Sequence, residues 1–163
     1  MWRLIKSWGI PIVLVVLFQF LGSRGLISDV RAPDLQGHLA TGSAYEGLSA
    51  DKGPVLVYFW GSWCGICRAM QSTISAVASD HRVISVALRS GTPADVRRYQ
   101  EEQGFNVPAL ADETGYWAEA YGVRGVPALF FVDSEGVVKS ATTGFTSEAG
   151  IRLRLWRLGP GSQ

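Results

Sequence analysis

Cys64 and Cys67 are the only cysteines in this chain of 163 residues. On a helix, their spacing places the two Cα atoms about 5 Å apart, a distance that a disulfide bridges without backbone movement. The pair follows an apolar run and begins a helical pattern, so Cys64 is expected at a helix N-terminus. Unpaired N–H groups and the helix dipole there favour a thiolate. We predict that Cys64 is a nucleophile and that Cys67, on the apolar face one turn later, resolves the mixed disulfide.

A cysteine pair of this kind also has uses other than redox chemistry. A zinc site needs more ligands, and the two histidines, His38 and His81, lie at no ligand spacing from the pair. A structural disulfide that closes so short a loop stabilises little. Two thiolates at this spacing suit Cu(I), so a copper-handling module stays open as the alternative. We expect no resident metal, no cofactor beyond the disulfide itself, and no catalytic role for either histidine.

The residues around the pair predict an α/β fold with a central mixed β-sheet flanked by helices. A β-α-β unit comes first, and a tight antiparallel hairpin and a terminal helix close the chain. Predicted strands cover residues 54–60, 82–88, 105–110, 128–132 and 137–141, and predicted helices cover 64–81, 92–104, 116–121 and 147–158. In the last helix Ile151, Leu155 and Leu158 are expected to be buried, and Arg152, Arg154 and Arg157 to face solvent.

The N-terminus carries a segment that is directed to a membrane. Residues 7–23 contain no charge, and Arg3 and Lys6 precede them. This pattern predicts a single-pass anchor over 1–24 with its N-terminus in the cytoplasm. A cleaved signal peptide remains the alternative, although the residues near Ser23 form a poor cleavage site. We expect residues 25–53 to form a linker and N-terminal extension, and 54–160 to form the domain.

Composition excludes several classes of protein. The 47% of apolar residues is too high for a disordered chain, and 15 Lys and Arg balance 14 Asp and Glu. No basic footprint for nucleic acid follows from this balance.

Two motifs resemble those of the thioredoxin superfamily. They are VLVYFWGSWCGIC at residues 55–67 and YGVRGVPALFFVD at 121–133, followed by the hairpin glycine Gly136. The resemblance spans about residues 32–158. Within it, the segments 32–34 and 110–115 and the membrane leader look most like the TlpA-like, membrane-tethered branch.

This resemblance implies a thioredoxin-like fold and a surface that binds an extended substrate. Pro127 is implied to be cis and to face the cysteines, limiting metal binding, while the backbone of Val126 pairs with substrate. Trp63, Gly65 and Ile66 would line the same surface, and Trp63 could instead simply cover the helix end.

The family also implies an activity and a setting. We expect a protein disulfide oxidoreductase on the periplasmic side of the bacterial inner membrane. It would reduce disulfides of envelope proteins, in a context of copper stress or cytochrome c maturation. An integral-membrane thiol donor would have to recharge it, because the compartment is oxidising.

Three positions depart from the patterns of relatives. Tyr58 stands where many thioredoxins carry a buried acid, and Gly61 where peroxidases of the superfamily carry Thr or Ser. Between the cysteines, the dipeptide 65–66 lacks the histidine of strongly oxidising relatives. The direction of electron flow therefore stays open.

Overall fold

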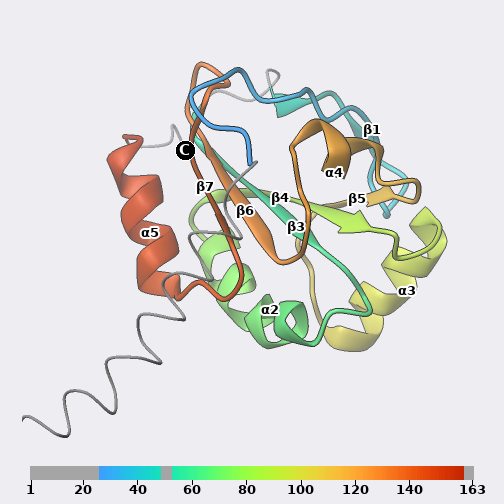
Figure 1. The fold of residues 1–163 in the computed structure, drawn as a ribbon. Helices are drawn as coiled ribbons and strands as arrows, with labels where there is room; N and C mark the ends of the chain where they lie inside the picture. The colour runs from blue at the N-terminus through green and yellow to red at the C-terminus, as the bar shows by residue number, and fades with distance from the viewer. Residues whose placement is uncertain (1–25, 49–52, 160–163) are drawn as a thin grey trace, which may run out of the picture.

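The computed structural model describes residues 26–48 and 53–159 (Figure 1). Their main feature is a five-stranded sheet in the order β5-β4-β3-β6-β7. Its strands are β3 (Val55–Trp60), β4 (Arg82–Leu88), β5 (Ala109–Asp112), β6 (Ala128–Val132) and β7 (Val138–Thr143). β4 runs parallel to β3 and β5, whereas β6 runs antiparallel to β3 and β7. The predicted mixed sheet is confirmed.

Helices cover both faces of this sheet. They are α2 (Gly65–Ala78), α3 (Pro93–Gln103), α4 (Tyr116–Ala120) and α5 (Glu148–Arg157). Side chains of α2, α3 and α5 share one hydrophobic cluster, and α4 and the N-terminal segment contribute to the cluster on the other face. The sheet therefore lies between two apolar layers.

The central strand β3 is buried along its whole length. Alternate side chains enter the cluster beneath α2, namely Leu56, Tyr58 and Trp60. The others enter the opposite cluster, namely Val55, Val57 and Phe59. Because both faces are covered, the strand reads as one continuous apolar run instead of an alternating pattern. It ends at the loop that carries the cysteines.

The segment 26–48 packs across one face of the sheet and reaches both of its edges. Arg31 bridges to Val137 beside β7, and Leu39 bridges to Leu110 of β5. Between them Leu35 is fully buried. The segment also forms a small antiparallel ladder of β1 (Gly37–His38) and β2 (Ala44–Tyr45). The segment expected to form a linker and N-terminal extension thus docks on the sheet along much of its described length.

The strand expected over 105–110 is displaced to Ala109–Asp112. Pro108 has no N–H for a ladder, and its carbonyl accepts from the backbone of Ser85. The amide of Gln100 donates to the carbonyls of Phe105 and Val107 at 3.0 and 2.6 Å. Residues 105–108 are therefore held by a side chain from α3.

Two expectations for α5 need correction. Leu158 is only half-buried, because the helix ends at Arg157. Arg152 does not simply face solvent: it bonds Asp80 at 2.6 Å and the carbonyl of Ala76 at 3.0 Å, both at the end of α2. Arg154 lies over the ring of Phe131 at 5.6 Å. These two arginines fix the terminal helix in place.

The anchor expected over residues 1–24 lies outside the described residues. None of the helices that the structure describes has the length and apolar character to cross a bilayer.

Candidate active site

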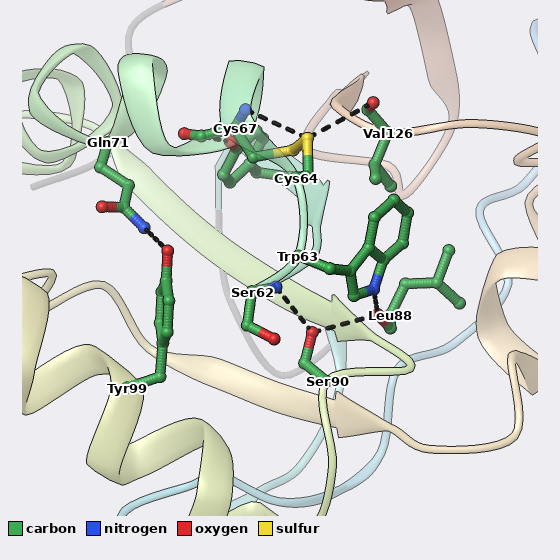
Figure 2. Close-up of a disulfide and its surroundings, with 10 residues drawn as sticks. Ser62, Trp63, Cys64, Cys67, Gln71, Leu88, Ser90, Tyr99 and Val126 are labelled. Atoms are coloured by element: carbon green, nitrogen blue, oxygen red, sulfur yellow. Dashed lines mark hydrogen bonds between the residues drawn. A yellow bond between two sulfur atoms is a disulfide. The ribbon is translucent and has the colours of Figure 1, made fainter.

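Cys64 and Cys67 form a disulfide at the start of α2 (Figure 2). Their Cα atoms are 5.2 Å apart, which agrees with the helical spacing. Cys64 is the N-cap residue of the helix, and its backbone is extended, with φ of −95° and ψ of 107°. The backbone N–H of Cys67 points at the Cys64 sulfur, with 3.1 Å between nitrogen and sulfur. The pair therefore lies at the predicted junction of strand and helix.

The two sulfur-bearing residues differ in access. Cys64 retains 7% of its surface, whereas Cys67 retains 1%. A reagent from solvent therefore meets the Cys64 side of the disulfide. In the reduced protein, the Cys67 N–H and the positive end of α2 would stabilise a negative charge on Cys64.

The loop before β6 faces Cys64. The Val126–Pro127 peptide bond is cis, as the family resemblance implied. The carbonyl oxygen of Val126 lies 3.7 Å from Cys64 Sγ, so it could accept a hydrogen bond from a reduced thiol. The N–H of Gly144 donates to the Pro127 carbonyl at 2.8 Å and ties this loop to the end of β7.

Trp63 lies beside the disulfide with 60% of its surface exposed. Its indole Nε1–H donates to the carbonyl of Leu88 at 3.2 Å, and this bond fixes the ring over the loop after β4 (Figure 2). A Cβ atom at Gly61 would lie 2.6 Å from Trp63 Cε2. Trp63 therefore both covers the turn and offers a face to solvent. The close approach also leaves no room at position 61 for the side chain that the peroxidases carry.

A serine that sequence reasoning missed supports the same loop. Ser90 Oγ accepts from the backbone N–H of Ser62 at 3.0 Å and donates to the Leu88 carbonyl at 3.1 Å. No local pattern marks Ser90, because its partner lies 28 residues away.

The remaining predicted surface residues lie around the disulfide as well. Gly65 and Ile66 are exposed on the first turn of α2, and no atom lies within 4 Å of a Cβ placed at Gly65. Val126 is half-buried and Pro127 is buried. Loops that are distant in sequence thus bring all seven predicted site residues to one end of the sheet.

Beneath the pair lies a neutral hydroxyl. Tyr58 is fully buried in β3, and its O–H donates to the Cys67 carbonyl at 3.4 Å. Burial raises the pKa of Tyr58 well above its usual value, and the nearby Tyr99 raises it further. The phenol therefore stays protonated, unlike a carboxylate at this position.

Neither histidine belongs to this site. His38 is part of β1, and His81 follows α2 at its far end, where Nδ1 lies 3.1 Å from Asp80. Within residues 26–48 and 53–159, no group of three or more His, Cys, Asp or Glu side chains could hold a metal ion.

The model of the AhpC/TSA family matches residues 27–141 of this chain. The chain belongs to this family. It is 37% identical over 131 residues to a thioredoxin-like protein of Haemophilus influenzae, covering 80% of this chain and 75% of that protein. It is 31% identical over 131 residues to the thiol-disulfide oxidoreductase ResA of Geobacillus kaustophilus, covering 78% of this chain and 72% of ResA.

A solved structure of a thioredoxin has the same fold as this AhpC/TSA protein. The exposed lipoprotein thioredoxin Etrx1 of Streptococcus pneumoniae superposes with a TM-score of 0.69 at 30% identity, covering 77% of this chain and 99% of Etrx1. The chain thus has a thioredoxin-like α/β fold. Together with its relatives and its disulfide, the fold identifies it as a thiol-disulfide oxidoreductase.

Proposed function

We propose that this protein is a reductant of disulfides in proteins of the bacterial envelope, with Cys64 as the nucleophile and Cys67 as the resolving cysteine. The observation that carries the assignment is the asymmetry of the pair. Cys64 is the more accessible residue and receives the Cys67 N–H on its sulfur, while Cys67 is closed off by the helix.

The reaction has two exchange steps. The Cys64 thiolate attacks one sulfur of a substrate disulfide, and the other substrate sulfur leaves as a thiolate. Cys67, having lost its proton, then attacks Cys64 Sγ and expels the second substrate sulfur. The substrate gains two electrons, and the Cys64–Cys67 disulfide closes.

Substrate would bind across the exposed end of the pair. An extended segment would pair with the backbone of Val126, beside Pro127. Trp63, Gly65 and Ile66 would contact its side chains. The exposed face of Trp63 and the exposed position of Ile66 support this arrangement.

The proposal includes a place in the cell. Residues 7–23 would hold the protein in the inner membrane by a single span, with the catalytic domain in the periplasm. An integral-membrane thiol donor would recharge it, because that compartment is oxidising. The motifs resemble those of the suppressor of copper sensitivity protein D, which favours a role in copper stress; cytochrome c maturation is the other setting. Retention in membranes after a carbonate wash tests the anchor.

The roles of the two cysteines are tested by a pair of matched variants. With a disulfide substrate such as insulin, reduced Cys67→Ser should accumulate a mixed disulfide through Cys64, and Cys64→Ser should form none. Mass spectrometry after acid quenching detects the adduct. Equal trapping by both variants would refute the assignment.

The direction of electron flow is tested by the reduction potential of the pair. A value near −270 mV, as in thioredoxin, supports a reductant, whereas about −120 mV, as in DsbA, indicates an oxidant.

A Cu(I)-handling module would use the same two sulfurs. Titration of Cu(I) into the reduced protein and into Cys64→Ala separates the two functions. Tight Cu(I) binding without insulin reduction would replace the proposed function by copper binding.

A further inference from the structure

Three arginines belong to the segments that form the reactive end of the molecule. Arg68 lies one turn after Cys64 on α2, and its N–H donates to the Cys64 carbonyl at 3.1 Å. Arg124 precedes Val126 by two residues in the loop that contacts Cys64 Sγ. Arg89 directly follows Leu88, whose carbonyl holds the Trp63 indole. All three are exposed, and each comes from a different segment of the chain.

These charges are not neutralised within the part of the chain that the structure describes. None of the three arginines forms an ion pair there, whereas Arg97, Arg98 and Arg152 all do. Cations left unpaired on one face create a positive potential over it.

The acids in the neighbouring loops are engaged elsewhere or remain apart. Asp95 bonds Thr92 and Arg98 at the start of α3. Asp112 is buried and accepts three backbone N–H bonds from the segment that begins α4. Glu113 and Glu119 are exposed in the same segment and make no ion pair with the three arginines.

The backbone at Arg89 adds a second observation. Its φ is 45°, in the left-handed region that favours glycine or asparagine. Its N–H donates to the Asp112 carbonyl at 2.9 Å, which fixes this conformation. A long cationic side chain thus occupies a strained position next to the site, where a smaller residue would fit more easily.

The same segments also carry exposed apolar side chains. Trp63 and Ile66 are exposed at 60% and 53%, and Phe145 is exposed at 57%. Phe145 follows Gly144, whose N–H bonds the Pro127 carbonyl, so it flanks the same loop. The surface that these segments form therefore combines exposed apolar side chains with the cations of Arg68, Arg89 and Arg124, which we call the basic rim.

We infer that this surface selects extended protein segments in which acidic residues flank the reactive cysteine. The inference rests on the proposed function and names the substrate class of the same site. Carboxylates of the segment would pair with the guanidinium groups of Arg68, Arg89 and Arg124, and an apolar neighbour would cover Ile66 or Trp63. The same rim repels cationic segments and so contributes to specificity.

Two disulfide peptides test the inference with the reduced full-length protein in a non-ionic detergent. Each carries one cysteine bound to 2-mercaptoethanol, flanked by glutamates in one peptide and by lysines in the other. At low ionic strength the glutamate peptide should be reduced about tenfold faster, and at 0.5 M salt the ratio should fall below about twofold.

Variants locate the effect. Changing Arg68, Arg89 and Arg124 together to Gln should bring the ratio of rates close to about 1, and Arg68→Gln and Arg124→Gln alone should each lower it. Arg157→Gln is the matched control, since Arg157 is exposed and is the last residue of α5. That end of α5 lies away from the start of α2, which carries the disulfide (Figure 1). Arg157→Gln should keep the full ratio.

The outcomes separate this inference from the function on which it rests. If both peptides are reduced at equal rates at low salt, or if the triple variant keeps the preference, the basic rim does not select substrate and the oxidoreductase assignment stands. If neither peptide is reduced, the proposed function fails and the inference fails with it. The salt series on the unmodified protein decides the point even if the triple variant does not fold.

Discussion

At the scale of single residues, Tyr58 sets the chemistry beneath the disulfide. Its buried hydroxyl donates to the Cys67 carbonyl, and burial raises its pKa so that it remains neutral. A neutral phenol cannot take the proton that Cys67 loses on attack, as a carboxylate could. The proton must therefore leave by another route, and the pH dependence of exchange should report the thiols alone.

Replacing Tyr58 by Phe tests this point. We expect Tyr58→Phe to lower the free energy of unfolding by about 1 kcal/mol, since one hydrogen bond is lost. The profile of exchange rate between pH 5 and 9 should keep its shape. Loss of one limb of that profile would show that the hydroxyl takes part in proton transfer. Urea unfolding and stopped-flow exchange supply the two measurements.

Gly61 is required by the position of Trp63. A side chain there would collide with the indole, because its Cβ would lie 2.6 Å from Cε2. We expect Gly61→Thr to push the ring away from the Leu88 carbonyl and to cost about 1–3 kcal/mol. Gly65→Ala is the matched control, since its Cβ meets open space and the helix gains propensity. Tryptophan fluorescence and urea unfolding should separate the two; an unchanged spectrum in Gly61→Thr would contradict the packing.

At the scale of elements, a polar contact links the terminal helix α5 to the end of α2. Arg152 bonds Asp80 at 2.6 Å and Glu148 at 2.8 Å. The Arg152 guanidinium, and then the His81 imidazole, lowers the pKa of Asp80 below its usual value. A carboxyl group with a lowered pKa contributes stability above its unfolded pKa and loses it as the pH falls through the folded pKa.

The pH dependence of this contact is testable. Unfolding by urea at pH 6 and at pH 2.5 should show that Arg152→Gln is less stable than the unmodified protein at pH 6, and that the difference shrinks at pH 2.5. Arg157→Gln, from the same helix, should show little difference at either pH. A constant difference for Arg152→Gln would mean that packing of its side chain matters more than the ion pair.

Local signals were sufficient to predict most elements. The sequence predicts a helix from residue 92, and the structure shows a helix that begins at Pro93 after a capping box between Thr92 and Asp95. The strand β4 was also predicted over its full length. The predicted start of β5 was wrong. The side chain of Gln100, in α3, donates to the carbonyls of Phe105 and Val107, which precede the strand. Contacts of that kind leave no periodic mark in the sequence.

At the scale of the whole molecule, the N-terminal segment belongs to the folded body. Leu35 is fully buried between the sheet and α4, and the Tyr121 hydroxyl donates to the Pro33 carbonyl at 2.7 Å. We expect Leu35→Ala to cost about 2–5 kcal/mol in urea unfolding, because it leaves a cavity. Val30→Ala, in the same segment but 48% exposed, should change stability by less than about 0.5 kcal/mol. Similar small losses for both would contradict a structural role for this segment.

The assembly of the site shows where prediction from sequence reaches its limit. The disulfide and the helix start follow from the spacing of Cys64 and Cys67. The place of Val126 and Pro127 opposite them came from resemblance, since their contact spans 62 residues of sequence. The support from Ser90 and the gathering of arginines depend on which loops meet at one end of the sheet. No single segment encodes that meeting.

Residues 26–48 cover backbone groups at both edges of the sheet. At the β7 edge, the N–H of Asp29 donates to the carbonyl of Val138, and the N–H of Val138 donates to the carbonyl of Val30. At the β5 edge, the N–H of Ala40 donates to the carbonyl of Ala109. Further along β7, Lys139 is exposed and adds a charge to that margin. An edge strand with unpaired N–H and C=O groups can pair with strands of other chains, and such pairing leads to aggregation. The N-terminal segment thus closes part of each edge of the sheet to strands of other proteins, including any disulfide substrate that binds in an extended form.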